Sequence, residues 1–368
     1  MSEKKVGILT FHRASNYGAV LQAYALQQYL KKGNIYNEII DYRCSHIEKV
    51  YSENFMVSGK SPISMVKKNI KKWVNIKKNK KFIEFRRNYL NISKNTYNLE
   101  NKFDMKKVYD VFIVGSDQVW NLNQTGKDTT YFLDFVDKGK WSYAASLGKN
   151  SITNEEKEIF KDMINSFEKV SIREEENIDI IKSVGFKKQI NVNVDPVFLL
   201  NKNEWVSLIE KEEKRKEKKE KYVLIYTVKQ PVHLIEKAKK YAQEHNCKVI
   251  YLHSDFNYKE FFKNQNIKNV FVKSPIEFLK LILDAECVFT TSFHGTAFSI
   301  LFEKEFWAEV DKDGKLNNRI FNLLQKLNIE DRILDYNPKT LDSKINWKVV
   351  RENVLKEREK SKKYLFDE

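Results

Sequence analysis

A chain of 368 residues is longer than one typical hydrophobic core, so two domains are expected. An apolar fraction of 42% and an aromatic fraction of 13% exclude a disordered chain. The formal net charge of +16 favours anionic partners: phosphorylated small molecules, acidic glycans, anionic lipid surfaces or nucleic acid.

The cysteines and the N-terminal segment indicate the compartment. Cys44, Cys247 and Cys287 are far apart and include no Cys-x-x-Cys pair, which fits a reducing compartment and gives no zinc signature. The apolar run near the N-terminus is too short for a signal peptide, and no stretch is long enough to span a membrane. We therefore expect a cytoplasmic protein.

Short β-branched runs alternate with amphipathic helical patterns along most of the chain. Strands are expected at residues 6–11, 111–115, 170–172, 222–228, 248–252 and 287–291, and a helix at 17–30. Continuous apolar strands between helices are typical of parallel sheets covered on both faces. In such α/β folds ligands bind beyond the carboxyl ends of the strands, so the loops that follow the strands are the places to search.

The first such loop is HRASNYG, residues 12–18, between a strand and a helix. Asn16, Tyr17 and Gly18 stand at the helix N-terminus, where backbone amides and the helix dipole can bind an anion. The loop lacks the G-x-G-x-x-G and G-x-x-x-x-G-K-[ST] fingerprints, which disfavours dinucleotide binding and P-loop chemistry. An ordinary strand-to-helix turn would explain the same residues.

The stretch 67–87 is strongly basic and belongs to an expected helical insertion at 61–90. It carries ten basic side chains and one acidic one, with Trp73 and phenylalanines among the lysines. This mixture resembles an interfacial helix, which would give peripheral contact with an anionic membrane. A solvated helix face is the alternative.

The loop GSDQVWN, residues 115–121, follows a buried strand. Asp117 could orient or deprotonate a hydroxyl, and Gln118 could hydrogen-bond a sugar. Ser116 or Asp117 could equally be a helix N-cap.

Arg173 directly follows the strand at 170–172. A guanidinium group there suits bidentate capture of a carboxylate or phosphate. The alternative is a salt bridge to one of the next three residues, Glu174, Glu175 and Glu176.

Every residue from 210 to 221 is charged, which indicates a linker at 206–221. The chain then divides into an N-terminal domain at 1–205, a C-terminal domain at 222–345 and a terminal helix at 346–368.

The segment CVFTTSFHGTAFSILF, residues 287–302, places His294 and Gly295 between two apolar runs. The helix that follows is apolar on every side and should be buried. His294 would then stand at a helix N-terminus in a water-poor place. Gly295 would let a ligand approach the backbone, and Ser292 would add a donor. A histidine satisfied within the core is the alternative.

At these loops the chain resembles the polysaccharide pyruvyl transferase family. The matching segments occur in the family's order and run from residue 6 to about residue 332. They are ILTFHRASNYGAVLQAYAL, DVFIVGSDQVWN, YFLDFV, SYAASLG, VSIRE, VDPVFLL, TTSFHGTAFSILF and NNRIFNLLQKLNIEDR.

The resemblance implies a fold similar to GT-B glycosyltransferases, with two Rossmann-like domains facing a cleft and the N-terminal domain on the acceptor side. It also implies transfer of pyruvate from phosphoenolpyruvate onto two hydroxyls of one sugar of a cell envelope glycan or its precursor. A cyclic ketal and phosphate are the products, and no metal or organic cofactor is implied. The acceptor could be a lipid-linked oligosaccharide, whereas nucleic acid is not an expected partner.

The family's S-F-H-G motif implies that His294 is the catalytic general acid, and its strand-following arginine corresponds to Arg173, a clamp for the donor anion. A family lysine has Lys315 as its closest counterpart, with Lys312 nearby. Glu174 stands where the family often has aspartate.

Phosphoenolpyruvate chemistry agrees with these residues. The donor is strongly anionic, so Arg173, Lys315 and the helix terminus at Gly295 could bind it. Histidine titrates near neutrality and suits an acid in a dry pocket, while Asp117 could take a hydroxyl proton. The catalytic candidates are His294 and Asp117. The substrate-binding candidates are Arg173, Lys315, Ser292, Gly295, Asn16, Tyr17, Gly18, Ser116, Gln118 and Arg319.

Three rival interpretations remain. The nearest is a nucleotide-sugar glycosyltransferase on the same fold, with Glu303 or Glu305 as the ribose ligand. The others are a basic nucleic-acid-binding protein and a non-catalytic glycan-binding relative.

Overall fold

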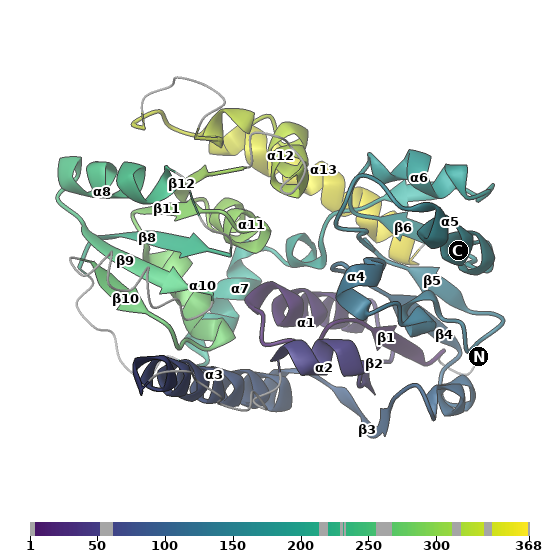
Figure 1. Cartoon of the computed structure of the whole chain (residues 1–368). Coiled ribbons are helices and arrows are strands. Elements are labelled where there is room, and N and C mark those ends of the chain that lie inside the picture. Colours follow the sequence, from purple (N-terminus) through teal and green to yellow (C-terminus); the bar gives the residue numbers. More distant parts are fainter. Residues whose placement is uncertain are drawn as a thin grey trace. The chain divides into compact units, whose positions relative to one another are not determined.

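The computed structural model describes residues 4–51, 62–212, 220–228, 231, 233–254, 267–310, 318–334 and 341–366 (Figure 1). For residues 51, 62–68 and 318 it describes the backbone and not the side chains. Backbone contacts divide the chain into two units. Unit 1 comprises Met1–Ser52, Phe85–Leu200 and Leu355–Glu368, and unit 2 comprises Glu53–Glu84 and Asn201–Val354. Two long helices, α3 (Pro62–Tyr89) and α13 (Trp347–Phe366), begin in unit 2 and end in unit 1.

The boundary between the units differs from the expected one at residue 205. Helix α7 (Lys202–Glu210) begins earlier, because Asn201 and Glu204 form a capping box at its N-terminus. The fully buried ring of Trp205 packs edge-on against Phe298 of unit 2, with ring centroids 5.0 Å apart. The first part of the expected linker is therefore helix, and residues 213–219 lie outside the described residues.

Unit 1 contains a five-stranded parallel sheet in the order β3-β2-β1-β4-β5. Its strands are β1 (Val6–Leu9), β2 (Asn37–Tyr42), β3 (Ile92–Tyr97), β4 (Val111–Val114) and β5 (Lys140–Ser142). A parallel pair, β6 (Val170–Ile172) and β7 (Ile190–Val192), adjoins it through isolated bridges from β5 and the loop after it. The helices of the unit are α1 (Tyr17–Lys32), α2 (Ser45–Tyr51), α4 (Leu122–Thr125), α5 (Asn154–Ile164) and α6 (Asn177–Ser183), with 3₁₀ turns η1 (Lys102–Lys107), η2 (Thr129–Phe132) and η3 (Pro196–Leu199).

Unit 2 contains a second five-stranded parallel sheet, in the order β10-β9-β8-β11-β12. Its strands are β8 (Tyr222–Thr227), β9 (Lys248–His253), β10 (Lys268–Val270), β11 (Cys287–Thr290) and β12 (Glu305–Ala308). Its further helices are α8 (Leu234–Glu244), α10 (Pro275–Asp284), α11 (Phe293–Leu301) and α12 (Asn318–Lys326), with the 3₁₀ turn η4 (Glu330–Arg332). The expected strands at 6–11, 111–115, 170–172, 222–228, 248–252 and 287–291 are confirmed.

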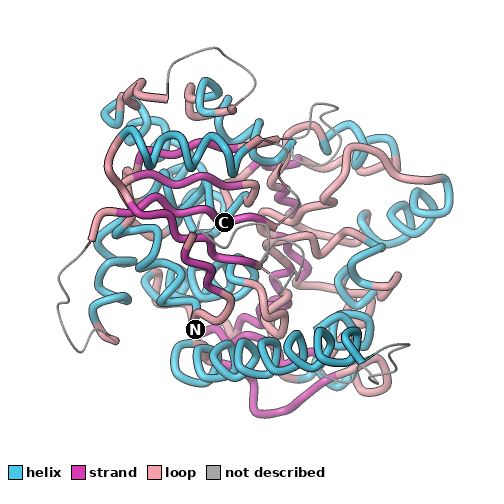
Figure 2. The backbone as a smooth tube through the Cα atoms, turned by 60° about the vertical axis from the view of Figure 1, so that its left-hand side comes forward, coloured by secondary structure: helices cyan, strands magenta, loops and turns pink. Residues whose placement is uncertain are grey.

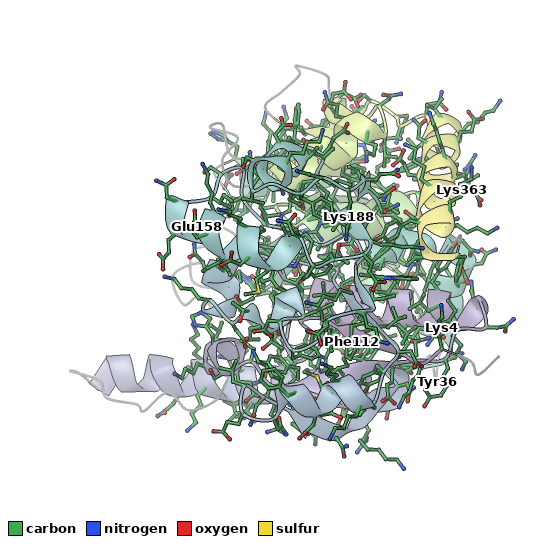
Figure 3. The ribbon with its side chains drawn as sticks, turned by 90° about the vertical axis from the view of Figure 1, so that its right-hand side faces the viewer. Lys4, Tyr36, Phe112, Glu158, Lys188 and Lys363 are labelled. Carbon is green, nitrogen blue, oxygen red and sulfur yellow. The ribbon has the colours of Figure 1, made fainter. Side chains whose placement is uncertain are left out.

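The central strands of both sheets are buried on both faces, as their unbroken apolar sequences predict. Every residue of β1, β4, β8 and β11 is buried. Helix α8 packs on β8, β9 and β11, and the strands of each sheet run side by side between helices (Figure 2). In unit 1, Phe112 of β4 lies in the interior, whereas Glu158 and Lys363 lie on outer helices (Figure 3).

Both sheets have the same strand order, third-second-first-fourth-fifth in chain order. The order reverses between the first and the fourth strand, and loops leaving these two strands diverge to opposite faces of the sheet. The switch point therefore lies at β1 and β4 in unit 1 and at β8 and β11 in unit 2. None of the helices described is long and apolar enough to cross a membrane.

Candidate active site

The loops after β1 and β4 are tied together by a buried polar network at the switch point of unit 1. Gln22 of α1 donates to Thr10 Oγ1 (2.8 Å) and accepts from the Ser116 backbone amide (3.1 Å). Thr10 Oγ1 in turn donates to the Ser116 carbonyl (3.2 Å). All three residues are almost inaccessible to solvent, so each bond is worth more than an exposed one and holds the two loops in a fixed relation.

The first loop contains a charged cluster that the sequence did not reveal. Arg13 binds Asp41 of β2 with two parallel bonds of 2.7 Å, and the buried His12 places Nε2 3.2 Å from the same carboxylate. Burial by itself would raise the pKa of Asp41, but bonds from His12 and Arg13 outweigh it and hold that pKa well below its usual range. Burial likewise lowers the pKa of His12 despite its carboxylate partner.

The N-terminus of α1 is stabilised by a cap from its own segment. The Asn16 side chain caps the helix by accepting from the Ala19 amide (3.3 Å). Tyr17 and Gly18 are buried within the unit. The ordinary strand-to-helix turn thus accounts for the local geometry of all three.

The loop after β4 corrects the N-cap interpretation of Ser116 and Asp117. Helix α4 begins only at Leu122, and Asn121 caps it. The Ser116 hydroxyl instead donates to the Ala144 carbonyl (2.8 Å). Asp117 has a φ of 70°, in the left-handed region that non-glycine residues seldom occupy, and its Oδ1 accepts from the Gln118 amide (2.9 Å). A strained carboxylate at a switch point is a candidate functional group.

The side chain of Gln118 is fixed by contacts with Asn121 and Gly148. Its Oε1 accepts from Asn121 Nδ2 (3.0 Å), and it packs so closely on Gly148 that a Cβ there would lie 2.1 Å from Oε1. This explains why glycine stands at position 148.

Arg173 is buried between two carboxylates at the end of β6. Its Nε donates to Glu174 (3.0 Å) and its Nη1 to Asp195 (2.6 Å). Burial would lower the pKa of Arg173, but the negative charges of Glu174, Asp195 and Asp117 outweigh it and raise that pKa. The alternative of an ion pair with Glu174 is therefore present, together with Asp195, which the sequence did not indicate. Because carboxylates outnumber the guanidinium, this cluster alone is not a positive site.

In unit 2, the S-F-H-G segment forms the turn from β11 into α11 at the switch point. The Ser292 hydroxyl caps the helix by accepting from the Gly295 amide (3.2 Å), and the Ser292 amide donates to Thr290 Oγ1 (3.0 Å). Every residue of α11 is buried, as the apolar pattern predicts, and His294 is only 8% exposed. A titratable ring is thereby held in a largely dry place at a helix N-terminus.

Gly295 has a packing role in the structure, and its expected approach to a ligand stays a prediction. A Cβ at this position would lie 2.5 Å from Thr290 Oγ1 and 3.1 Å from Cδ1 of Tyr226. Glycine therefore lets α11 pack closely on strands β11 and β8.

Arg319 lies beside the first residue of α11, with its guanidinium carbon 6.0 Å from the centre of the Phe293 ring. Lys315 and Lys312 lie outside the described residues. Of the predicted cations of unit 2, Arg319 is the one that the structure places near the S-F-H-G turn.

The acidic residues nominated for a ribose ligand have structural partners. Glu303 accepts from Arg351 (2.9 Å), and Glu305 accepts from the buried Arg332 (3.1 Å). Glu309, which the sequence did not single out, accepts from the first amides of α8, at His233 (2.9 Å) and Leu234 (2.6 Å).

A cavity of about 640 Å³ lies elsewhere in unit 1, at the amino-terminal edge of its sheet. Val6, Val111 and Trp141, at or near the starts of β1, β4 and β5, help to line it. None of the predicted site residues borders it, so we place the chemistry at the carboxyl edge instead. Over the residues that the structure describes, no cluster of three or more His, Cys, Asp or Glu side chains could hold a metal ion.

Two parallel sheets of this order define an α/β protein of the GT-B-like class. The fold is similar to that of a Listeria monocytogenes protein named as a UDP-N-acetylglucosamine 2-epimerase, with 11% identity, a TM-score of 0.50, and 100% of this chain and 91% of that chain covered. It is also similar to Staphylococcus aureus MnaA in complex with UDP, with 10% identity, a TM-score of 0.50, and 99% and 88% covered. At such identities the likeness concerns the fold alone. No curated protein sequence matches the chain.

The family model for polysaccharide pyruvyl transferase matches residues 16–308, well over half of the chain. The chain therefore belongs to the polysaccharide pyruvyl transferase family. It is a transferase of polysaccharide biosynthesis, and a sugar or polysaccharide is its acceptor.

Proposed function

We propose that the protein moves the pyruvate unit of phosphoenolpyruvate onto two hydroxyls of one sugar residue, forming a cyclic ketal and releasing phosphate. The observation that carries this proposal, beside family membership, is the buried His294 at the helix N-terminus beyond β11. The chemistry needs an acid shielded from water, and the burial of His294 supports this role for it.

The reaction balances without a cofactor. A proton is added to the methylene carbon of phosphoenolpyruvate, which becomes a methyl group, and the neighbouring carbon becomes electrophilic. One sugar hydroxyl attacks this carbon, and the second displaces phosphate to close the ketal. Of the two hydroxyl protons, one balances the proton placed on carbon and the other balances the one taken by phosphate.

His294 is proposed as the general acid. It serves either the methylene carbon or the departing phosphate, because both need a proton and both belong to the donor. Histidine suits this role since its ordinary pKa is near neutrality. Asp117 is proposed to accept a hydroxyl proton from the sugar.

Arg173 is proposed as a ligand of the donor anion, with its orientation fixed by Glu174 and Asp195. An incoming anion also meets those two carboxylates, so the donor needs further positive charge. Lys315, or its neighbour Lys312, and Arg319 are the proposed sources.

The proposed acceptor is a sugar of a cell envelope glycan or its lipid-linked precursor. A cytoplasmic enzyme, peripheral at the inner membrane face, would meet both phosphoenolpyruvate and such a precursor. Asn16, Tyr17, Gly18, Ser116 and Gln118 are the proposed contacts on the acceptor side.

Calorimetric titration with phosphoenolpyruvate, and with nucleotide sugars in parallel, tests the donor. Saturable binding of phosphoenolpyruvate is expected, whereas binding of a nucleotide sugar in its place would overturn the reaction assigned here. Arg173→Lys should weaken donor binding while keeping the buried charge, and Arg351→Lys, at an exposed pair, should not. An unchanged donor affinity in Arg173→Lys would remove Arg173 from the donor site.

The role of His294 is tested by phosphate release with an acceptor glycan. His294→Ala should lower turnover by about 10²-fold or more. His233→Ala, at an exposed histidine of the same unit, is the matched control and should keep wild-type turnover. Near-normal turnover in folded His294→Ala would exclude the acid role.

A further inference from the structure

One face of helix α3 is apolar, basic and exposed. Ile70, Trp73, Ile76, Lys80 and Ile83 follow one another at spacings of three or four residues and so lie on one side of the helix. We call them the α3 stripe. Trp73 is 56% exposed and Ile83 54%. Clustered exposed apolar side chains of this size mark an interaction surface rather than an ordinary solvated face.

The opposite face of α3 is already packed within unit 2. Val74 and Phe82 are buried. Lys78 donates to the Ser254 carbonyl (2.6 Å), and Lys81 donates to Glu277 of α10 (2.5 Å). The helix is therefore attached to its own unit by one side. The exposed isoleucines and tryptophan form a second apolar face, which takes no part in this packing.

The exposed face is also positively charged. Lys72, Lys77 and Lys80 are all exposed, and Glu84 is the single acidic residue in the sequence of α3. The Lys77 ammonium lies 3.7 Å from the centre of the Trp73 ring, so charge and aromatic surface are interleaved rather than segregated.

We propose that the α3 stripe docks on an anionic lipid bilayer, with the helix lying in the plane of the interface. Trp73 would sit at headgroup level, Ile76 and Ile83 would enter the acyl boundary, and the lysine stems would extend so that their charges reach lipid phosphates. Nucleic acid fits less well, because aliphatic isoleucines between the lysines have no partner on a phosphate backbone. This inference does not depend on the pyruvyl transfer proposed above.

Vesicle co-sedimentation at low salt is the test, with phosphatidylcholine vesicles that either lack or contain one third phosphatidylglycerol. The protein should bind the anionic vesicles and leave them at high salt. Lys72→Gln/Lys80→Gln should weaken partitioning by roughly 25-fold, from about fivefold for each lysine near the surface. Trp73→Ala/Ile83→Ser should weaken it by about tenfold or more.

Matched controls come from unit 1. Phe103→Ala removes an aromatic ring that is 61% exposed, and Lys94→Gln/Lys107→Gln removes two charges from exposed lysines. Both should bind vesicles as the wild type does. Equal losses in these controls, or no binding by the wild type, would overturn the proposal. So would an oligonucleotide that binds more tightly than the vesicles and displaces them.

A second readout uses lipids with brominated acyl chains, which quench nearby tryptophan. Trp73 is the most exposed of the six tryptophans, so its emission should be quenched on binding and the quenching should vanish in Trp73→Phe. His294→Ala should still bind and be quenched. Failure of pyruvyl transfer and failure of membrane docking are thus separately visible.

Discussion

Replacement of Gly295 by alanine distinguishes a packing role from a ligand role at the S-F-H-G turn. The new Cβ would lie 2.5 Å from Thr290 Oγ1, closer than real Cβ atoms come to a neighbour. Thr290 cannot move away without weakening two hydrogen bonds. Its hydroxyl donates to the Tyr226 carbonyl (2.7 Å) and accepts from the Ser292 amide (3.0 Å).

The expected cost follows from these contacts. A displaced buried hydroxyl costs about 1–3 kcal/mol, and an overpacked core costs a similar amount, ~1–3 kcal/mol. Alanine has a higher helix propensity than glycine, which stabilises the variant by about 1 kcal/mol. We expect a net loss of about 1–5 kcal/mol in the free energy of unfolding of unit 2. This corresponds to a fall in Tm of several degrees, at about 2–4 °C per kcal/mol for a unit of this size.

Urea unfolding of Gly295→Ala, Thr290→Ala and the double variant measures the contact directly. Thr290→Ala removes the hydroxyl that the new Cβ would meet, so the double variant should lose less than the sum of the single losses. A coupling energy of about 1–3 kcal/mol is expected. Wild-type stability in Gly295→Ala, together with weaker phosphoenolpyruvate binding, would refute the packing argument. Glycine would then serve close approach of the donor.

Three further outcomes are expected from charged groups. Asp195→Asn should lower the free energy of unfolding by about 3–5 kcal/mol in a urea titration, because the buried Arg173 loses a carboxylate; a loss below about 1 kcal/mol would contradict this. The folded-state pKa of Asp41 is depressed, so its contribution is complete above its unfolded pKa and disappears as the pH falls toward the folded value. In Asp41→Asn, Tm should fall less steeply with acid below about pH 4, and an identical acid slope would disprove the coupling. Glu309→Gln should cost about 0.5–2 kcal/mol and speed hydrogen exchange at the Leu234 amide, whereas unchanged exchange there would argue against the cap.

The sequence predicts the centre of each sheet better than its edges. Strands β1, β4, β8 and β11 are buried on both faces, so their apolar runs are unbroken and easily read. Strand β3, with the sequence ISKNTY, has three exposed polar residues at the sheet edge, and β10 and β7 are three residues long. Their pairing depends on neighbouring strands rather than on their own composition, so no local pattern indicates them.

The sequence also predicts single site residues better than their partners. Arg173 and Glu174 are neighbours in the chain, whereas Asp195 reaches Arg173 because β6 and β7 pair with Ile172 opposite Val192. In the same way, Asp41 meets Arg13 only through the pairing of β1 with β2. Such contacts follow from sheet register, which a single sequence does not contain.

The two units have the same strand order, and this order distinguishes Asp117 and His294 from Arg173. Asp117 follows β4 and His294 follows β11, and each of these strands is the fourth of its sheet, next to the first. The two residues therefore occupy equivalent positions at the two switch points. Arg173 follows β6, which adjoins β5 beyond the switch point, and it already has two carboxylate partners. Topology and charge agree with the proposal that Asp117 and His294 act on protons and that Arg173 orients the donor.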